Sequence, residues 1–164
     1  MSQSIVDIDT YLYTYEQLLA AIEGLTDSQL KWKATDAQWS VTEVLAHLAD
    51  HNIIVSFRIR EILANSEARL PAFSQDPWVA GQKSNEGNAS DILEIFRSLL
   101  LYNSLLFRRL SSEEWSKTGV NFKGETVTLE AIILAFIAHV QVHLAQIDRI
   151  KKGEISSQNS SCTI

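Results

Sequence analysis

Hydrophobic residues recur at steps of three and four over four long segments of the chain, at about residues 5–23, 41–64, 89–110 and 127–150. This spacing places them on one face of a helix. The fourth segment shows it most clearly, with Ile132, Ile133, Phe136, Val140, Leu144 and Ile147. Four long amphipathic helices in one chain predict an all-α fold, a four-helix bundle.

Helix-capping signals mark where these segments and two shorter ones begin. Ser40 and Glu43 have the spacing of a capping box, in which each side chain bonds the backbone N–H of the other residue. Thr26 with Gln29, and Ser111 with Glu114, repeat the pattern and predict short helices just after the first and third long ones. Gly24 is a natural stop for the first helix.

Two internal segments lack helical periodicity. Residues 65–88 hold both prolines and predict a long, non-helical crossover between the second and third helices. Residues 119–126 predict a turn or a short extended piece. We therefore expect a bundle domain over residues 1–154 and a disordered polar tail over residues 155–164.

Composition narrows the class of protein without changing the predicted fold. A length of 164 residues suits one domain, and 46% hydrophobic residues provide for a real core. The net charge of −6 argues against nucleic acid or an anionic membrane as the partner. The N-terminal residues lack a signal-peptide pattern, the most apolar stretch (residues 131–144) is short for a membrane span, and the single cysteine excludes an internal disulfide. We expect a cytoplasmic protein.

The four histidines form two pairs at a spacing of four, His47 with His51 and His139 with His143. Two imidazoles one helical turn apart can reach the same ion. A third histidine from a facing helix would complete a three-nitrogen site with an open coordination position, as in catalytic zinc sites. The alternative is that the histidines are ordinary core residues with hydrogen-bond partners.

Two polar residues lie within one turn of these histidines. Asp50 follows His47 by three positions, and Gln146 follows His143 by three. Either side chain could orient a ligating imidazole or meet a substrate. The alternative for both residues is a solvated helix face.

The chain resembles the DinB/YfiT-like family of metal-dependent proteins. The resemblance rests on Trp39-Ser40-x-x-Glu43-x-x-x-His47-Leu48 and on His139-x-x-x-His143-x-x-Gln146, and extends over about residues 5–150. It implies a bundle that holds a divalent ion, zinc or nickel, with His47, His139 and His143 as ligands. The family includes thiol-dependent transferases and isomerases, and homodimers are frequent in it. His51 has no counterpart in its three-histidine pattern, so it is a fourth ligand, a substrate-binding or proton-relaying neighbour, or a helix-face residue.

Three functional hypotheses follow. The first is a metal-dependent enzyme acting on a small molecule, either a transferase that activates a low-molecular-weight thiol or a hydrolase that uses metal-bound water. The second is a non-catalytic metal-binding or stress-response bundle with a structural ion, and the third is a bundle without metal. If the protein is an enzyme, residues 73–78 would cover the pocket, with Asp76 or Trp78 touching the substrate. The alternative is that this segment plugs one end of the bundle. No pattern assigns catalytic residues.

Overall fold

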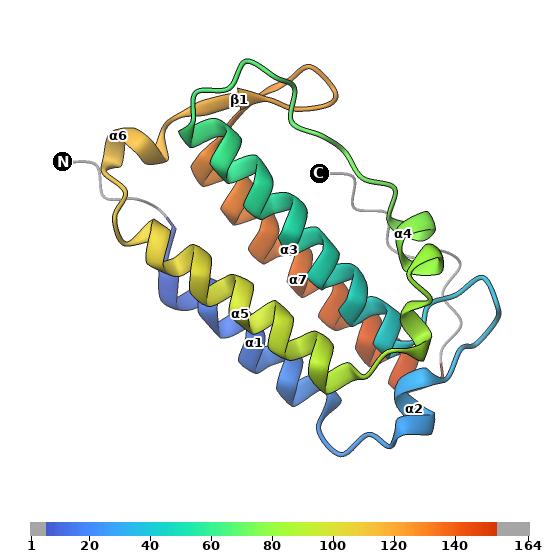
Figure 1. Ribbon diagram of the computed structural model, residues 1–164. Helices are drawn as coiled ribbons and strands as arrows, with labels where there is room; N and C mark the ends of the chain where they lie inside the picture. Colours follow the sequence, from blue (N-terminus) through green and yellow to red (C-terminus); the bar gives the residue numbers. More distant parts are fainter. Residues whose placement is uncertain (1–5, 154–164) are drawn as a thin grey trace.

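The computed structural model describes residues 6–153 and shows a four-helix bundle (Figure 1). The long helices are α1 (Ile8–Ile22), α3 (Val41–Leu63), α5 (Ala89–Phe107) and α7 (Leu129–Lys151). The predicted fold class is confirmed, and each helix boundary lies within three residues of its predicted position. The predicted tail, residues 155–164, lies outside the described residues, and the domain limit at residue 154 stays a prediction.

Each long helix packs against two others. Helix α1 lies beside α5 and α7, and α3 lies beside the same two, so α1 and α3 are diagonal in the bundle. Figure 1 shows that α3 and α5 run in one direction while α1 and α7 run in the other. Helices α3 and α5, the second and third long helices, are therefore parallel neighbours. The segment between them must return along the whole length of the bundle. Helix α3 has 23 residues, so that return spans about 34 Å.

Both predicted short helices are present with their capping boxes. Helix α2 (Asp27–Lys31) begins after Thr26, and α6 (Ser112–Trp115) begins after Ser111. In each box the N-cap hydroxyl accepts from the third residue of the helix, whose side chain accepts from the N-cap N–H. Local capping therefore sets where these elements start.

The prediction of a non-helical crossover over residues 65–88 is wrong in part. The crossover contains helix α4 (Gln75–Gly81) and a 3₁₀ turn, η1 (Ser84–Glu86), both packed against α3. Pro77 occupies the third position of α4, where its missing N–H would have had no partner within the helix. A proline that normally argues against a helix is thus accommodated in its first turn.

The predicted turn before the last helix is a small antiparallel hairpin of β1 (Thr118–Val120) and β2 (Thr126–Thr128). Its β1 strand also binds the crossover, because Leu70 N–H donates to the Val120 carbonyl at 2.7 Å. Gly119 lies against α3, since a Cβ there would stand 2.9 Å from Ile62 Cγ1. The hairpin therefore closes the end of the bundle where α3 ends and α7 begins.

One buried side-chain amide forms hydrogen bonds within the core. The buried Asn103 of α5 donates to the Tyr11 hydroxyl of α1 at 3.1 Å and to Ser56 Oγ of α3 at 2.8 Å. Arg60 donates to Asn103 Oδ1 at 3.0 Å. The amide thus bonds three helices and fixes their relative register.

Helix α7 is long and apolar enough to cross a membrane by length and composition alone. In the bundle it packs against α1 and α3, and its buried face carries two of the histidines. Core helices of soluble proteins satisfy the same criterion.

Candidate metal centre

Three of the four histidines converge on one point between α3 and α7. Because these helices are antiparallel neighbours, His47 near the start of α3 meets His143 near the end of α7, with His139 one turn away. His139 Nε2 lies 3.2 Å from His47 Nε2 and 3.0 Å from His143 Nε2. All three side chains are buried, and one nitrogen from each lies within 4.8 Å of the other two. Among residues 6–153 this is the single group of histidine, cysteine or acidic side chains that meets this criterion.

Gln146 holds the third imidazole in place. Its Oε1 lies 2.7 Å from His143 Nδ1. An amide oxygen can only accept, so His143 carries its proton on Nδ1 and presents the lone pair of Nε2 to the cluster. Of the alternatives that the sequence left open for Gln146, the structure therefore has the contact with an imidazole.

Burial keeps the imidazoles neutral. It lowers the pKa of His47 to about 2 and that of His143 to about 4, and it lowers the pKa of His139 further still. Neighbouring histidines lower the pKa of His47 and His139 in addition. A metal ligand must be a neutral imidazole, so the protonation state suits coordination.

The donor set fits a divalent transition metal ion. Nitrogens bound to zinc at 2.0–2.1 Å in tetrahedral geometry lie about 3.3 Å apart, close to the observed 3.0 and 3.2 Å. Without an ion, the lone pair of His143 Nε2 would face another ring nitrogen at hydrogen-bond distance. Zinc and nickel both accept imidazole, and three nitrogens leave an open position for a further ligand.

His51 lies beside the cluster and is buried, which excludes a solvated helix face. Its ring centroid is 4.0 Å from that of His139, and the ring stacks on Phe136 at 5.7 Å. Neither ring nitrogen has a hydrogen-bond partner among the described residues. His51 is not part of the group of three whose nitrogens converge.

Aromatic rings from outside the two helices cover the histidines. Trp39 packs on His47 with ring centroids 4.9 Å apart, and Phe73 of the crossover stacks on the same imidazole at 5.8 Å. Trp78 of α4 lies edge-on to Phe73 at 5.2 Å. Phe73 of the crossover thus lies against the cluster, and Trp78 packs on Phe73.

Asp50 is buried on α3 and accepts a hydrogen bond from Gln82, the C-cap residue of α4. Its Oδ2 accepts from Gln82 Nε2 at 2.9 Å, and burial raises the pKa of its carboxyl group. No hydrogen bond joins it to a histidine among residues 6–153. Asp50 therefore contacts the covering segment, whereas Gln146 contacts the cluster itself.

Sequence reasoning missed two neighbours of the site. Trp39 entered the sequence analysis as part of the family motif, and its place two residues before the helix did not indicate that its ring would reach His47. Arg58 was not assigned a role from the sequence, yet it is 4% exposed, and its charge adds to burial in lowering the pKa of His51. The one available signal was its spacing of seven from His51, which is two helical turns.

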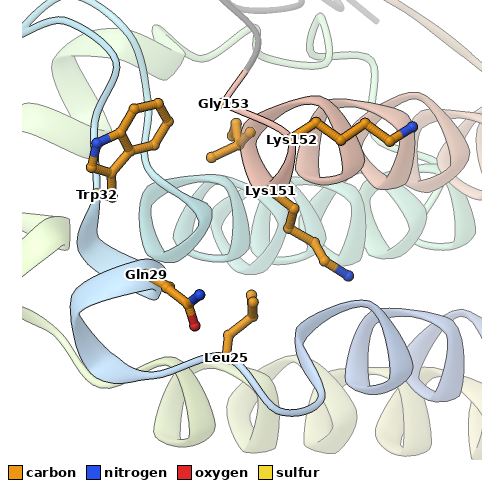
Figure 2. A pocket seen from close by; sticks show the side chains of 7 residues that line it. Leu25, Gln29, Trp32, Lys151, Lys152 and Gly153 are labelled. Atoms are coloured by element: carbon orange, nitrogen blue, oxygen red, sulfur yellow. The ribbon is translucent and has the colours of Figure 1, made fainter.

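A separate cavity of about 300 Å³ lies between α2 and the end of α7 (Figure 2). Its lining residues are Leu25, Gln29, Trp32, Ile150, Lys151, Lys152 and Gly153. The Lys151 amine donates to the Ala21 carbonyl, and Lys152 pairs with Asp148. No histidine, cysteine or carboxylate within residues 6–153 lines this cavity, so its described walls offer no metal-ligand set.

Comparison with known proteins identifies the family. The profile described as the DinB superfamily matches residues 10–147. The chain belongs to this superfamily. The expected family is thereby confirmed, and the matched range contains all four histidines.

Relatives found by sequence are named as metal-dependent hydrolases. YfiT of Bacillus subtilis, named "Putative metal-dependent hydrolase YfiT", is 26% identical over 83% of this chain and 77% of its own length. A protein of Geobacillus thermodenitrificans named in the same way is 27% identical over 84% of this chain and 78% of its own.

Solved structures agree on the fold. The structure of YfiT, described as a probable metal-dependent hydrolase with an unusual four-helix bundle topology, has a TM-score of 0.82 at 22% identity and covers 93% of this chain and 91% of that one. A mycothiol-dependent maleylpyruvate isomerase has a TM-score of 0.67 at 12% identity, with 90% of this chain and 63% of that one covered. Proteins that share this fold therefore include ones with different named activities.

Proposed function

We propose that this DinB superfamily member is a metal-dependent enzyme acting on a small molecule, with His47, His139 and His143 as the ligands of one divalent ion. The observation that carries the proposal is the convergence of three buried, neutral imidazole nitrogens on one point. When bound, such an ion lowers the pKa of a thiol or water in its open position and supplies a nucleophile at neutral pH.

The nucleophile we favour is a low-molecular-weight thiol, which would make the protein a thiol-dependent transferase. One large class of zinc hydrolases, with the H-E-x-x-H motif, uses a carboxylate as general base close to the metal ligands. No carboxylate joins the histidine group within the part of the chain that the structure describes. A free thiol has a pKa of about 8.5, far below that of water, so it would need less help from a base to ionise at the metal.

Residues around the ligands take supporting roles in this proposal. Gln146 orients His143, and His51, whose nitrogens are unpartnered, faces the substrate. Asp50 holds Gln82 and with it the α4 segment that covers the site. Phe73 and Trp39 exclude water from the imidazoles.

A metal-dependent hydrolase is the second candidate. The names of the sequence relatives support it, since YfiT and its Geobacillus counterpart are both named as hydrolases. The choice between zinc and nickel, the homodimer and the cytoplasmic location stay predictions from the sequence.

The test is metal content, measured by elemental mass spectrometry on untagged protein purified without a nickel column. We expect about one zinc or nickel ion per chain, its loss in His143→Ala, and its retention in Val142→Ala, a neighbouring exposed position. Wild-type protein that stays free of metal after incubation with zinc and nickel would contradict the proposal.

The loaded protein then separates the two candidates. A transferase consumes 1-chloro-2,4-dinitrobenzene only when a thiol is added, whereas a hydrolase releases p-nitrophenol from p-nitrophenyl acetate without one. Turnover of the ester alone would replace the transferase with the hydrolase.

A further inference from the structure

Arg58 is a buried cation without an acidic partner among the described residues. It is 4% exposed, and its Nε and Nη2 donate to the Pro71 carbonyl at 3.0 and 2.7 Å. None of the four ion pairs between described residues includes it. Buried charges are normally paired with opposite charge, and a carbonyl oxygen supplies only a partial one. The guanidinium therefore lacks an anion.

His51 gives a second, independent indication. It is 1% exposed, and neither of its ring nitrogens has a partner among residues 6–153. A neutral imidazole has one N–H donor and one acceptor nitrogen. Because buried polar atoms are nearly always hydrogen-bonded, a ligand at this position would supply the missing partner.

The two side chains are placed to meet the same ligand. They lie seven residues apart on α3, which is two helical turns on one face, with about 10 Å between their Cα atoms. Helical side chains lean toward the N-terminus, so the Arg58 guanidinium reaches back toward His51. The crossover closes over both, since Pro71 accepts from Arg58 and Phe73 lies 6.1 Å from His51.

We propose that Arg58 and His51 form an anion subsite beside the three-histidine cluster, so that the ligand at the metal carries a carboxylate several bonds from its coordinating atom. The guanidinium fork matches a carboxylate, and the carboxylate supplies the negative charge that Arg58 lacks. His51 lies between the cluster and Arg58 and donates its N–H to the same ligand. This inference rests on the proposed metal site and adds the chemical class of what binds there.

The experiment measures the affinity of zinc-loaded protein for two thiols of equal length, 4-mercaptobutyrate and 4-mercapto-1-butanol, by isothermal titration calorimetry. We expect wild-type protein to bind the carboxylate at least about tenfold more tightly. Arg58→Met should abolish this preference. Arg60→Met is the matched control and should keep it, because Arg60 points to Asn103 and Tyr102 instead.

The ratio of the two affinities separates recognition from structure. If Arg58 only anchors the crossover through Pro71, Arg58→Met weakens both thiols equally and preserves the ratio, which overturns the proposal. Equal affinities of wild-type protein for the two thiols also overturn the proposal, and this outcome can be seen without any variant. It would leave the metal site and thiol binding unaffected. Wild-type protein that binds no zinc would instead refute the proposed function, and the subsite with it.

Discussion

At the scale of single residues, the site depends on which nitrogen of each histidine carries the proton. Gln146 decides this for His143, because its carbonyl oxygen at 2.7 Å can only accept from Nδ1. The Nδ1 atoms of His47 and His139 have no such partner in the described part of the chain. One of the three imidazoles is thus oriented by a hydrogen bond, and the other two by packing against aromatic rings and each other.

Replacing Gln146 with leucine should therefore weaken the site without dismantling it. Gln146→Leu leaves the Nδ1–H of His143 buried without an acceptor, and we expect zinc affinity to fall by about ten- to a hundredfold. Competition with a chromophoric chelator measures it. Gln141→Leu on the exposed side of α7 serves as the control, since Gln141 bonds only Gln17. Equal affinities in the two variants would contradict the role of Gln146.

At the scale of elements, the sequence determined the long helices well because their signals are local. Periodicity and caps depend on residues within one or two turns, and Ser40, Thr26 and Ser111 all act as predicted. Helix α4 was missed because its evidence is not local. Seven residues containing Pro77 and Gly81 show no periodicity, and the segment is helical where it packs on α3.

The capping boxes differ in burial, which predicts different costs of removal. Ser40 is buried and its hydroxyl also donates to Asn85 Oδ1, whereas Thr26 caps a short, exposed helix. We expect Ser40→Ala to lower the free energy of unfolding by about 2 kcal/mol and Thr26→Ala by about 0.5–1 kcal/mol. Urea denaturation of the two variants measures both. Equal losses would show that the bond to Asn85 adds nothing.

At the scale of the whole molecule, the sequence predicted the composition of the site but not its surroundings. The pairs at a spacing of four indicated which histidines share a face, and the packing of α3 on α7 supplies the facing helix that a third histidine required. Contacts from other elements could not be predicted this way. Phe73 and Pro71 reach the site only because parallel α3 and α5 require a long return segment.

Four buried histidines also make the stability of the metal-free protein depend on pH. Their folded pKa values, about 4 for His143 and lower for the others, lie below the ordinary 6.5. The unfolded chain therefore takes up protons near pH 6.5 while the folded chain does not. Stability is complete above pH 6.5 and is lost as the pH falls toward 4, by about 1.4 kcal/mol per pH unit for each histidine.

Urea midpoints of metal-free protein at pH 7.5, 6.0 and 5.0 measure this loss. Ordinary carboxylates stay ionised over most of this range, so the histidines dominate. His51→Phe keeps a ring against Phe136 and removes one titrating group, so its midpoint should fall less steeply. A wild-type midpoint that does not move between pH 7.5 and 5.0 would contradict the buried, neutral state of the imidazoles.

The distance along the chain between the converging histidines has a consequence for biosynthesis. His47 and His139 touch in the bundle but are 92 residues apart in sequence, and His143 follows later still. During translation the first histidine leaves the ribosome long before its partners exist. A growing chain therefore cannot bring the three imidazoles together until α7 emerges and docks on α3.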